Sequence, residues 1–300
     1  MQTETFKPWC LVLVLWGDKY SAVHINAIVT NAFLHSASCS EAILMTDCHR
    51  ENLDERVRQV VISDDLNRPE CKSNYTIKLS LFDSRVLPPH RPCVYLDLDT
   101  VVIGDLGRIA ALIRDPNDLF MLPPGGLQGF GALRRWLFWL TGGRHMATGN
   151  SSIVAFHSGM DPNLTLEFLR LRSASVALPK VLDNDDLFIS WFGQRRLKAI
   201  PPHLGVMFRR EFLTRFRPLG WLLNRLPWVR RRRDAIVAVT FNGVEHKLEN
   251  LLQLPDGALH RDSKGRFGYW SNKEMGSIRD KILKAAANLL PHDGVMGKSP

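Results

Sequence analysis

Short apolar runs alternate with segments of helical periodicity through the first hundred residues. The strand candidates are Cys10–Trp16, Ala42–Thr46, Val60–Ser63 and Cys93–Leu98, and Tyr20–Leu34 has the apolar spacing of a helix between the first two. Strands separated by helices typically form a mostly parallel sheet that helices cover on both faces. With 45% hydrophobic residues, a chain of 300 can bury such a core. We therefore predict an α/β fold around one open, mostly parallel sheet.

The loops that follow these strands are the first candidates for a binding site. In open α/β sheets, ligands bind at the edge where the parallel strands have their carboxyl ends. Trp16 and Gly17 begin the loop WGDKY after the first strand, and Asp47 follows the second strand. Their position alone makes these three residues candidates for ligand binding.

Two acids, Asp97 and Asp99, follow the fourth apolar strand in the run VYLDLDTVVIGDL. Side chains in extended chain alternate sides, so residues two apart project to the same side and their carboxylates can converge. A converging pair binds a hard divalent cation, Mg²⁺ or Mn²⁺, which keeps its other positions for phosphate oxygens and water. We predict a metal site here; a solvated turn with two acids is the alternative.

The rest of the chain is less regular. Glycine and proline interrupt the stretch after Ile103, where a short aromatic segment contains Arg134, Arg135, Trp136 and Trp139. Further on, we predict strands at Ser151–His157 and Ala235–Thr240 and helices at Leu164–Arg172 and Lys273–Leu289. This pattern favours one domain over residues 8–250 and a tail with a terminal helix over residues 251–300.

Positive charge is concentrated in one segment. Residues 205–233 contain nine arginines and one acid, against a formal net charge of +9 for the whole chain. Within Arg217–Arg233, arginines alternate with Trp and Leu, which suits an anionic membrane surface, where arginine contacts lipid phosphate and aromatic rings lie at headgroup depth. We favour the membrane over a solvated basic face. Nucleic acid is the weaker alternative, because no nucleic-acid-binding motif accompanies the segment.

The cysteines and the apolar segments bear on localisation. Five cysteines without a CxxC pair fit neither a disulfide framework nor a zinc ribbon, which favours a reducing compartment. The apolar run Trp9–Trp16 is far shorter than the ~20 residues that span a bilayer. We predict a cytoplasmic protein, either free or peripheral on the inner face of the membrane.

Several segments, taken in order, resemble glycosyltransferases of the GT-A fold, notably the glycogenin-like and lipopolysaccharide galactosyltransferase-like group and its bacterial relatives. They are VLWGDKY, Thr46-Asp47, NYTIKLSLF, YLDLDTVVIGDL, GNSSIVAFHSG, DNDDLFISWF and VTFNGVEHK, and they extend from residue 10 to about residue 250. The resemblance implies transfer of a hexose from a nucleoside diphosphate sugar to a glycan or a lipid-linked acceptor. The matched group retains the anomeric configuration, but the sequence leaves retention or inversion open, together with the donor and the acceptor.

The resemblance also implies roles for individual residues. Asp97 and Asp99 match the DxD pair, with Asp99 the more direct metal ligand and Asp97 also near the donor ribose. Lys78 matches a basic residue that helps to bind the donor. Asn150 and Ser151 match residues around the transferred sugar, and Asp185 and Asp186 match an acidic segment on the acceptor side. Carboxylates suit a hydroxyl nucleophile, and a lysine suits phosphate.

One position departs from the pattern of that group. Its members usually supply a third metal ligand from a histidine in a run like HFxGxxKPW, and this chain has Thr240 at that place. His246 stands where the group has a phosphate-binding lysine, and Lys247 follows it, so both are candidates for contact with the diphosphate. Asn242, His246 or water remain open as the third metal ligand.

Two other functions are compatible with the same residues. A phosphatase of the haloacid-dehalogenase kind would use Asp97 as nucleophile and Asp99 as acid, with Lys180 and Asp185-Asp186 as its later motifs. Three strand–helix units precede Asp97, whereas the nucleophile strand of such a phosphatase normally comes early. A non-catalytic basic adaptor on a degenerate transferase scaffold is the second alternative, motivated by Thr240.

Overall fold

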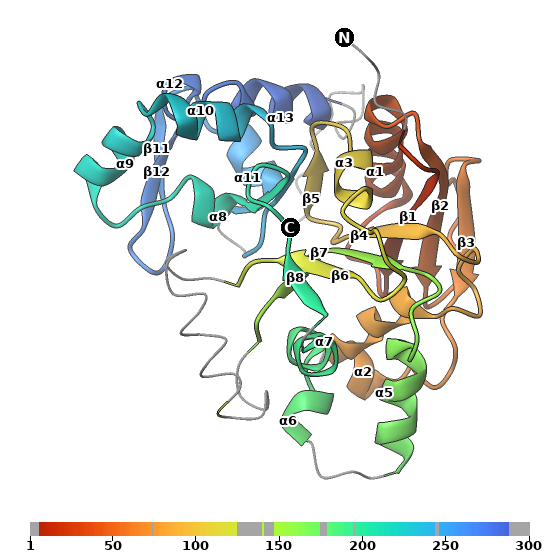
Figure 1. Ribbon diagram of the computed structural model, residues 1–300. Coiled ribbons are helices and arrows are strands. Elements are labelled where there is room, and N and C mark those ends of the chain that lie inside the picture. Colours follow the sequence, from red (N-terminus) through yellow and green to blue (C-terminus); the bar gives the residue numbers. More distant parts are fainter. Residues whose placement is uncertain are drawn as a thin grey trace, which may run out of the picture.

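The structure is a computed structural model that describes residues 6–73, 75–124, 140, 147–174, 179–194, 196–243 and 246–287. Its centre is a seven-stranded sheet with the order β3-β2-β1-β4-β7-β6-β8 (Figure 1). The strands are β1 (Trp9–Leu15), β2 (Cys39–Thr46), β3 (Val57–Val61), β4 (Pro92–Leu96), β6 (Leu119–Leu122), β7 (Asn150–His157) and β8 (Leu197–Ala199). Only β7 runs against its neighbours β4 and β6 within this sheet. The predicted α/β fold with a mostly parallel sheet is confirmed.

Helices cover both faces of this sheet because its central strands are apolar on both sides (Figure 1). Leu11 and Leu13 of β1 pack into one core with α1 (Ala22–His35) and α3 (Gly107–Ala110). Cys10 and Val12 pack into the opposite core. The elements on that side are α2 (Pro69–Ser73), the 3₁₀ helix η1 (Thr76–Phe82), α5 (Leu164–Ser173), α6 (Pro179–Leu182) and α7 (Asp185–Gly193).

A second lobe is built around a three-stranded sheet, β5 (Thr100–Val102), β10 (Ala238–Thr240) and β9 (Gly205–Met207). One side of this sheet adds Val102 and Ala238 to the core under α1, and the other side adds Val101 and Val239 to a third core. The lobe also contains α8 (Phe208–Glu211), α9 (Arg217–Leu223), α10 (Pro227–Asp234), α11 (Leu248–Leu252), the hairpin β11 (Ala258–Arg261) and β12 (Phe267–Trp270), α12 (Asn272–Met275) and α13 (Ile278–Ala286).

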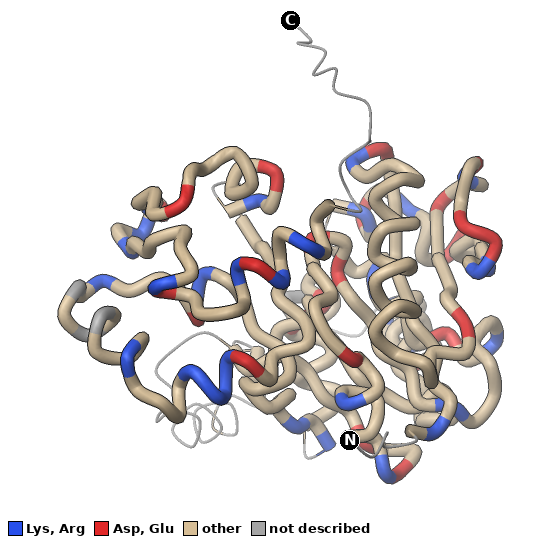
Figure 2. Tube along the Cα trace, turned by 90° about the horizontal axis from the view of Figure 1, so that it is seen from above, with Lys and Arg blue, Asp and Glu red and all other residues tan. Residues whose placement is uncertain are grey.

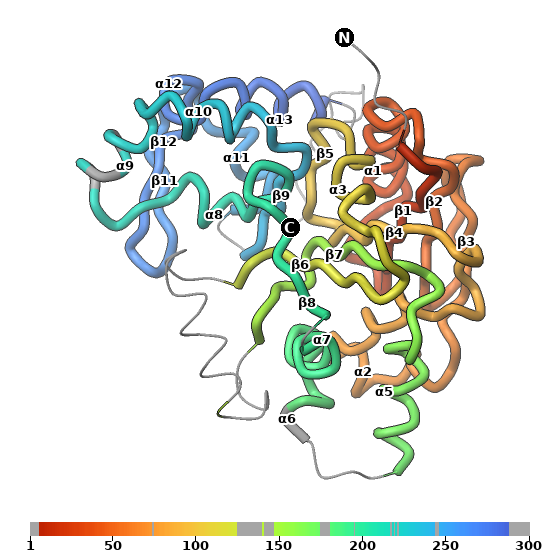
Figure 3. Tube along the Cα trace, in the orientation of Figure 1, coloured from red at the N-terminus to blue at the C-terminus, as the bar shows by residue number. Residues whose placement is uncertain are grey.

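Residues 251–287 belong to the folded second lobe and contribute to its core. Trp270 and Ile278 are fully buried in the third core together with Val239. Asn31 of α1 donates a hydrogen bond to the carbonyl of Ala285 in α13, which connects the two lobes. In the chain trace, the blue C-terminal segments lie against the turquoise ones in the second lobe, and α13 extends from there toward α1 (Figure 3).

Several predicted boundaries are wrong by a few residues. The fourth strand ends at Leu96 and not at Leu98, because Asp97 begins a turn, and the third strand is Val57–Val61 and not Val60–Ser63. The predicted strand Ala235–Thr240 begins at Ala238. The predicted helix Lys273–Leu289 is two helices, because Gly276 has a φ of 68° that a helix does not contain.

The aromatic segment around Arg134, Arg135, Trp136 and Trp139 lies outside the described residues. Among the helices that are described, none has the length and apolarity required to cross a membrane.

Candidate active site

Four strands bring the predicted site residues to one edge of the large sheet. β1, β2 and β4 are parallel, so Trp16, Asp47 and Asp97 follow them at the same edge. β7 is antiparallel to β4, so Asn150 begins at this edge as well. The backbone N–H of Asp97 donates to the carbonyl of Ser152 at 2.8 Å, which fixes the end of β4 against the start of β7.

Asp97 is held by a buried lysine and a buried tyrosine. Lys78 Nζ lies 2.8 Å from Asp97 Oδ1 and 3.6 Å from Asp185 Oδ2, so one ammonium group bridges two carboxylates. Tyr95 donates its hydroxyl to Asp97 Oδ1 at 2.5 Å. Burial alone would lower the pKa of Lys78, but Asp97, Tyr95 and Asp185 together raise it well above its ordinary value, so the lysine stays charged.

Asp99 is anchored to the second lobe. Its backbone carbonyl accepts from the N–H of Phe241 at 2.9 Å, and its Oδ1 accepts from the hydroxyl of Thr240 at 3.0 Å. Burial and the nearby charge of Asp97 raise the pKa of Asp99 to about 6. The charge of Asp97 therefore acts on Asp99. The two residues lie in a turn, where the N–H of Thr100 donates to the carbonyl of Asp97, and not in the extended chain from which their pairing was predicted.

The residues at this place fit a hard divalent cation. A cation would relieve the repulsion that raises the pKa of Asp99, and two carboxylates with phosphate oxygens and water are a common ligand set for Mg²⁺ and Mn²⁺. Asn242 adds an oxygen: its Nδ2 donates to Ser152 Oγ at 3.1 Å, and its buried Oδ1 has no partner among the described residues. Within those residues, no group of three His, Cys, Asp or Glu side chains forms a metal site. Among the described residues, the oxygen ligands available to a cation here are two carboxylates and neutral protein oxygens.

A pocket of about 330 Å³ opens beside Asp99. The loop after β1 contributes one wall, and Lys247 and Glu249 contribute another. The remaining residues around it are Tyr20, Ser21, His24, Ile28, Leu98, Thr100, Val101, Phe241 and Leu248. Burial lowers the pKa of His24, whose ring nitrogen lies 2.5 Å from the carbonyl of Leu98. The lining of the pocket is therefore polar at Asp99 and partly apolar elsewhere.

The predicted acceptor-side acids contact the predicted sugar-side residues. Asp186 accepts from the backbone N–H of Ser151 at 2.6 Å and from Asn150 Nδ2 at 3.2 Å. Asp185 accepts from Ser151 Oγ at 2.7 Å. Burial and the neighbouring Asp185 raise the pKa of Asp186 to about 6. The structure thus brings together Asp97, Asp185, Asp186, Lys78, Asn150 and Ser151, which the sequence separates by more than a hundred residues.

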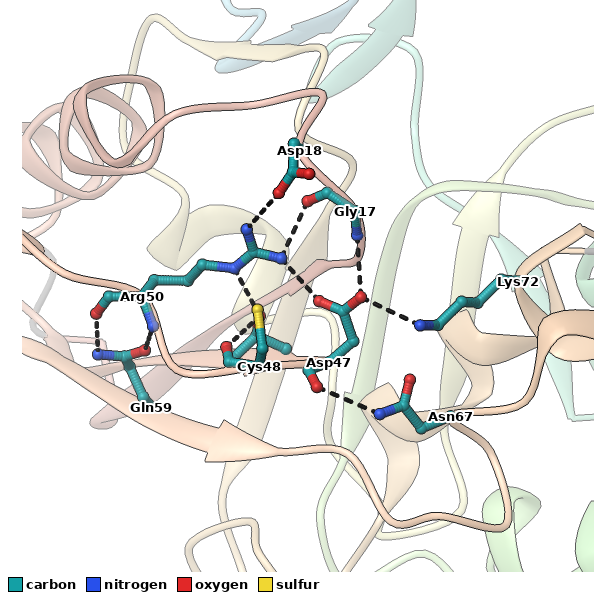
Figure 4. Close-up of polar contacts among 9 residues, drawn as sticks. Gly17, Asp18, Asp47, Cys48, Arg50, Gln59, Asn67 and Lys72 are labelled. Atoms are coloured by element: carbon teal, nitrogen blue, oxygen red, sulfur yellow. Dashed lines mark hydrogen bonds and ion pairs between the residues drawn. The ribbon is translucent and has the colours of Figure 1, made fainter.

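Asp47 has a structural set of partners that the sequence analysis did not predict (Figure 4). Its carboxylate accepts from the backbone N–H of Gly17 and forms ion pairs with Arg50 at 2.7 Å and Lys72 at 3.1 Å. Arg50 also donates to the carbonyl of Gly17 and to Asp18. Gly17 takes a φ of 64° in this loop, a conformation that suits glycine. Asp47 and Arg50 therefore fix the loop that borders the pocket.

The two candidates for contact with the diphosphate, His246 and Lys247, differ in their exposure to solvent. His246 is 1% exposed and packs against Phe208 and His260, with ring centroids 6.0 and 5.4 Å away. A phosphate could reach His246 only after this cluster moved. Lys247 is exposed and lines the pocket. Trp16 is partly buried beside Tyr75.

Solved structures with the same fold are glycosyltransferases. The apo structure of the bifunctional glycosyltransferase WbbM matches with a TM-score of 0.58 at 13% identity, over 96% of this chain and 51% of WbbM. The galactosyltransferase LgtC, in complex with donor and acceptor sugar analogues, matches with a TM-score of 0.51 at 13% identity, over 94% of this chain and 98% of LgtC. This chain therefore spans about half of WbbM and nearly all of LgtC.

No protein-family model matches the chain, and no curated protein sequence matches it. At 13% identity, the likeness to WbbM and LgtC is a likeness of fold. The chain has the GT-A fold.

Proposed function

We propose that the protein is a metal-dependent glycosyltransferase that moves a hexose from a nucleoside diphosphate sugar to a hydroxyl group of a glycan or glycolipid. The observation that carries this proposal is the pair Asp97 and Asp99 at the edge of a GT-A sheet, with Asp99 opening into a pocket of about 330 Å³. The fold alone would not choose a reaction, because function resides in the site.

The charges at the site support a diphosphate as ligand. Asp97 and Asp99 would hold Mn²⁺ or Mg²⁺, which supplies positive charge to the departing nucleoside diphosphate. Lys247 lines the pocket and presents a cation to phosphate oxygens. Lys78 forms ion pairs with Asp97 and Asp185. We therefore propose that it positions these two carboxylates, in addition to its predicted role in binding the donor.

Asn150, Ser151, Asp185 and Asp186 form the polar side of the site next to the metal pair. Amide and hydroxyl groups there suit sugar hydroxyls. Asp186 has a pKa of about 6 and could therefore take a proton from an attacking hydroxyl near neutral pH. We assign Asp185, Asp186 and Asn150 to the reacting sugar and its acceptor.

A thermal-shift screen of nucleotide sugars, with and without Mn²⁺, tests the proposal. A matching donor should stabilise the wild-type protein only with metal, and Asp99→Ala should abolish that shift. Asp65→Ala removes an exposed acid outside the pocket and should leave the shift intact. A shift that survives Asp99→Ala contradicts the metal assignment, and the absence of any metal-dependent nucleotide binding favours the adaptor.

The phosphatase alternative has its own test. Hydrolysis of a phosphate ester with Mg²⁺ that Asp97→Asn abolishes would identify Asp97 as a nucleophile. The structure pairs Asp97 with Lys78, and Tyr95 also donates to one of its oxygens, so both carboxylate oxygens of the required nucleophile are engaged. We therefore expect no ester hydrolysis by the wild-type protein.

A further inference from the structure

The helices α9 and α10 form a hairpin at the outer end of the second lobe (Figure 1). We call residues 215–231 the basic hairpin. Phe216, Leu222, Leu223 and Trp228 are 63%, 50%, 38% and 65% exposed there. Twelve large hydrophobic side chains of the described residues are exposed, and these four lie within thirteen consecutive residues. A concentration of this kind indicates a binding surface, whereas single exposed hydrophobic residues are ordinary.

The hairpin exposes these side chains because its other side is fixed to the lobe. In α10, Val229 and Arg233 are buried, and Trp228 and Arg231 lie on the opposite side of the helix. Arg233 forms an ion pair with Glu211 at 2.6 Å and donates to Asn224 Oδ1, at the end of α9. The apolar side chains are therefore held outward by a packed scaffold.

The exposed charge of the basic hairpin has one sign. No acid occurs between residues 212 and 233, and Glu211 is already paired with Arg232 and Arg233. Arg215, Arg225, Arg230 and Arg231 are exposed. Figure 2 shows the arginines of this segment in blue along the outer lobe. The surface therefore combines guanidinium groups with apolar side chains and lacks an acid of its own between them.

We propose that the basic hairpin docks the protein on an anionic lipid bilayer. Guanidinium groups bind lipid phosphate, while Trp228, Leu222 and Leu223 enter the boundary between headgroups and acyl chains. A nucleic acid would use only the guanidinium groups of this surface, because exposed leucines have no partner on a phosphate backbone. A protein partner would have to present a complementary acidic face, whereas an anionic bilayer offers phosphate and an apolar boundary together.

Vesicle sedimentation tests this proposal without any sugar substrate, so its outcome is independent of the transferase assay. The full chain should sediment with vesicles of phosphatidylcholine and phosphatidylglycerol, and much less with phosphatidylcholine alone. Arg225→Ser with Arg231→Ser should weaken partitioning about fivefold for each arginine removed. Leu222→Ser with Trp228→Ser should weaken it about tenfold or more, at high and low salt alike.

Matched variants elsewhere on the surface serve as controls. Leu34→Ser with Val61→Ser removes side chains that are 67% and 60% exposed, and Arg68→Ser with Arg170→Ser removes exposed arginines. Both controls should bind vesicles like the wild-type protein, and all variants should keep its melting temperature. The proposal is overturned if the wild-type protein does not bind anionic vesicles, or if the control variants lose as much vesicle binding as the hairpin variants. It is also overturned if the hairpin variants bind RNA more weakly than the wild-type protein but bind vesicles equally well.

Discussion

Lys78 is the single cation between Asp97 and Asp185 at the edge of the sheet. Lys78→Met would leave both carboxylates partly buried without their counter-charge. We expect the free energy of unfolding to fall by about 3–5 kcal/mol, the usual loss when one partner of a buried ion pair is removed. Urea unfolding measures this loss, and donor binding should weaken in parallel.

The control for this prediction is Lys72→Met. Lys72 is also paired with an aspartate, Asp47, but its side chain is 34% exposed against 12% for Lys78. Its removal should cost about 1 kcal/mol or less. Equal losses in the two variants would mean that the burial of Lys78 has no energetic consequence.

Asp186 gives the stability of the protein a pH dependence of known sign. Its pKa is about 6 in the folded protein against an ordinary value of 3.8. Between these values the folded protein keeps a proton that the unfolded chain has lost, so the free energy of unfolding falls as the pH rises through this interval. Asp99 has a similarly raised pKa, so Asp186→Asn should reduce this fall without removing it, and the variant should be the more stable protein above about pH 6, as measured by urea unfolding without metal.

Asp54 provides the opposite case. Its ion pair with Arg56 lowers its pKa to about 2, so its contribution is present above pH 3.8 and is lost as the pH falls through 2. Asp54→Asn should therefore leave the pH dependence of the free energy of unfolding unchanged between pH 4 and 6. If Asp54→Asn and Asp186→Asn changed the pH dependence of the free energy of unfolding alike between pH 4 and 6, Asp186 would not be the source of that dependence.

Asp97 and Asp99 were singled out because two acids follow an apolar strand, and the structure has this strand end directly before them, at Leu96. The alternation of side chains in extended chain does not apply to the pair, because the chain turns here and the N–H of Thr100 donates to the carbonyl of Asp97. Tyr95 and Arg50 were missed, because their partners depend on contacts across the fold. For Arg50, the signal was a basic residue three positions after Asp47 in a loop at the binding edge.

The loop after β1 is the element that the site most depends on for its shape. Arg50 donates to Gly17 and Asp18 within this loop, and the loop supplies Asp18, Lys19 and Tyr20 to the pocket. Arg50→Met should free the loop and raise the KM for the donor about tenfold, because charged hydrogen bonds of this kind contribute about 1.5–3 kcal/mol each. The kcat should change much less.

Arg58→Met is the matched control for that prediction. Arg58 pairs with Glu41 at 2.5 Å and donates to the carbonyl of Val86, at the β3 edge of the sheet. It should leave the KM unchanged. A kcat that fell as far as the KM rose in Arg50→Met would place Arg50 in the reaction itself.

The elements with strong periodicity were predicted well and their ends less well. The strand before Asp97 ends two residues early because a turn follows Leu96, and no periodic pattern marks that turn. Gly276 interrupts the predicted terminal helix although the apolar spacing continues past it. A glycine inside a helical pattern is ambiguous until its φ is known.

At the scale of the whole molecule, the third core decides whether the second lobe is stable. Trp270 is fully buried in it, and Tyr269, its neighbour in β12, is 36% exposed. Trp270→Ala should lower the free energy of unfolding by about 3–5 kcal/mol. Because the three-stranded sheet contributes side chains to two cores, we expect a single unfolding transition at a lower midpoint.

Tyr269→Ala is the control and should cost about 1 kcal/mol or less. Two separate transitions in Trp270→Ala, seen by calorimetry, would show that the lobes unfold independently.

The architecture was predictable for the first hundred residues, where strands and helices alternate. Of the strands of the second lobe only β10 was predicted, and the three-stranded sheet was not, because β5, β9 and β10 are three residues each and come from distant parts of the chain. Their pairing depends on tertiary contacts that a short apolar run does not reveal. Residues 251–300 were interpreted as a tail with a terminal helix for the same reason.

β5 begins at Thr100, directly after Asp99, and its next two residues, Val101 and Val102, pack into different cores. The carboxylate of Asp99 therefore lies one peptide unit from the strand that both lobes share. A rigid rotation of one lobe against the other would therefore strain β5 or move it. A cation bound by Asp99, as we propose, would therefore lie beside the strand that joins the two lobes, and a change in the angle between the lobes would move one of its ligands.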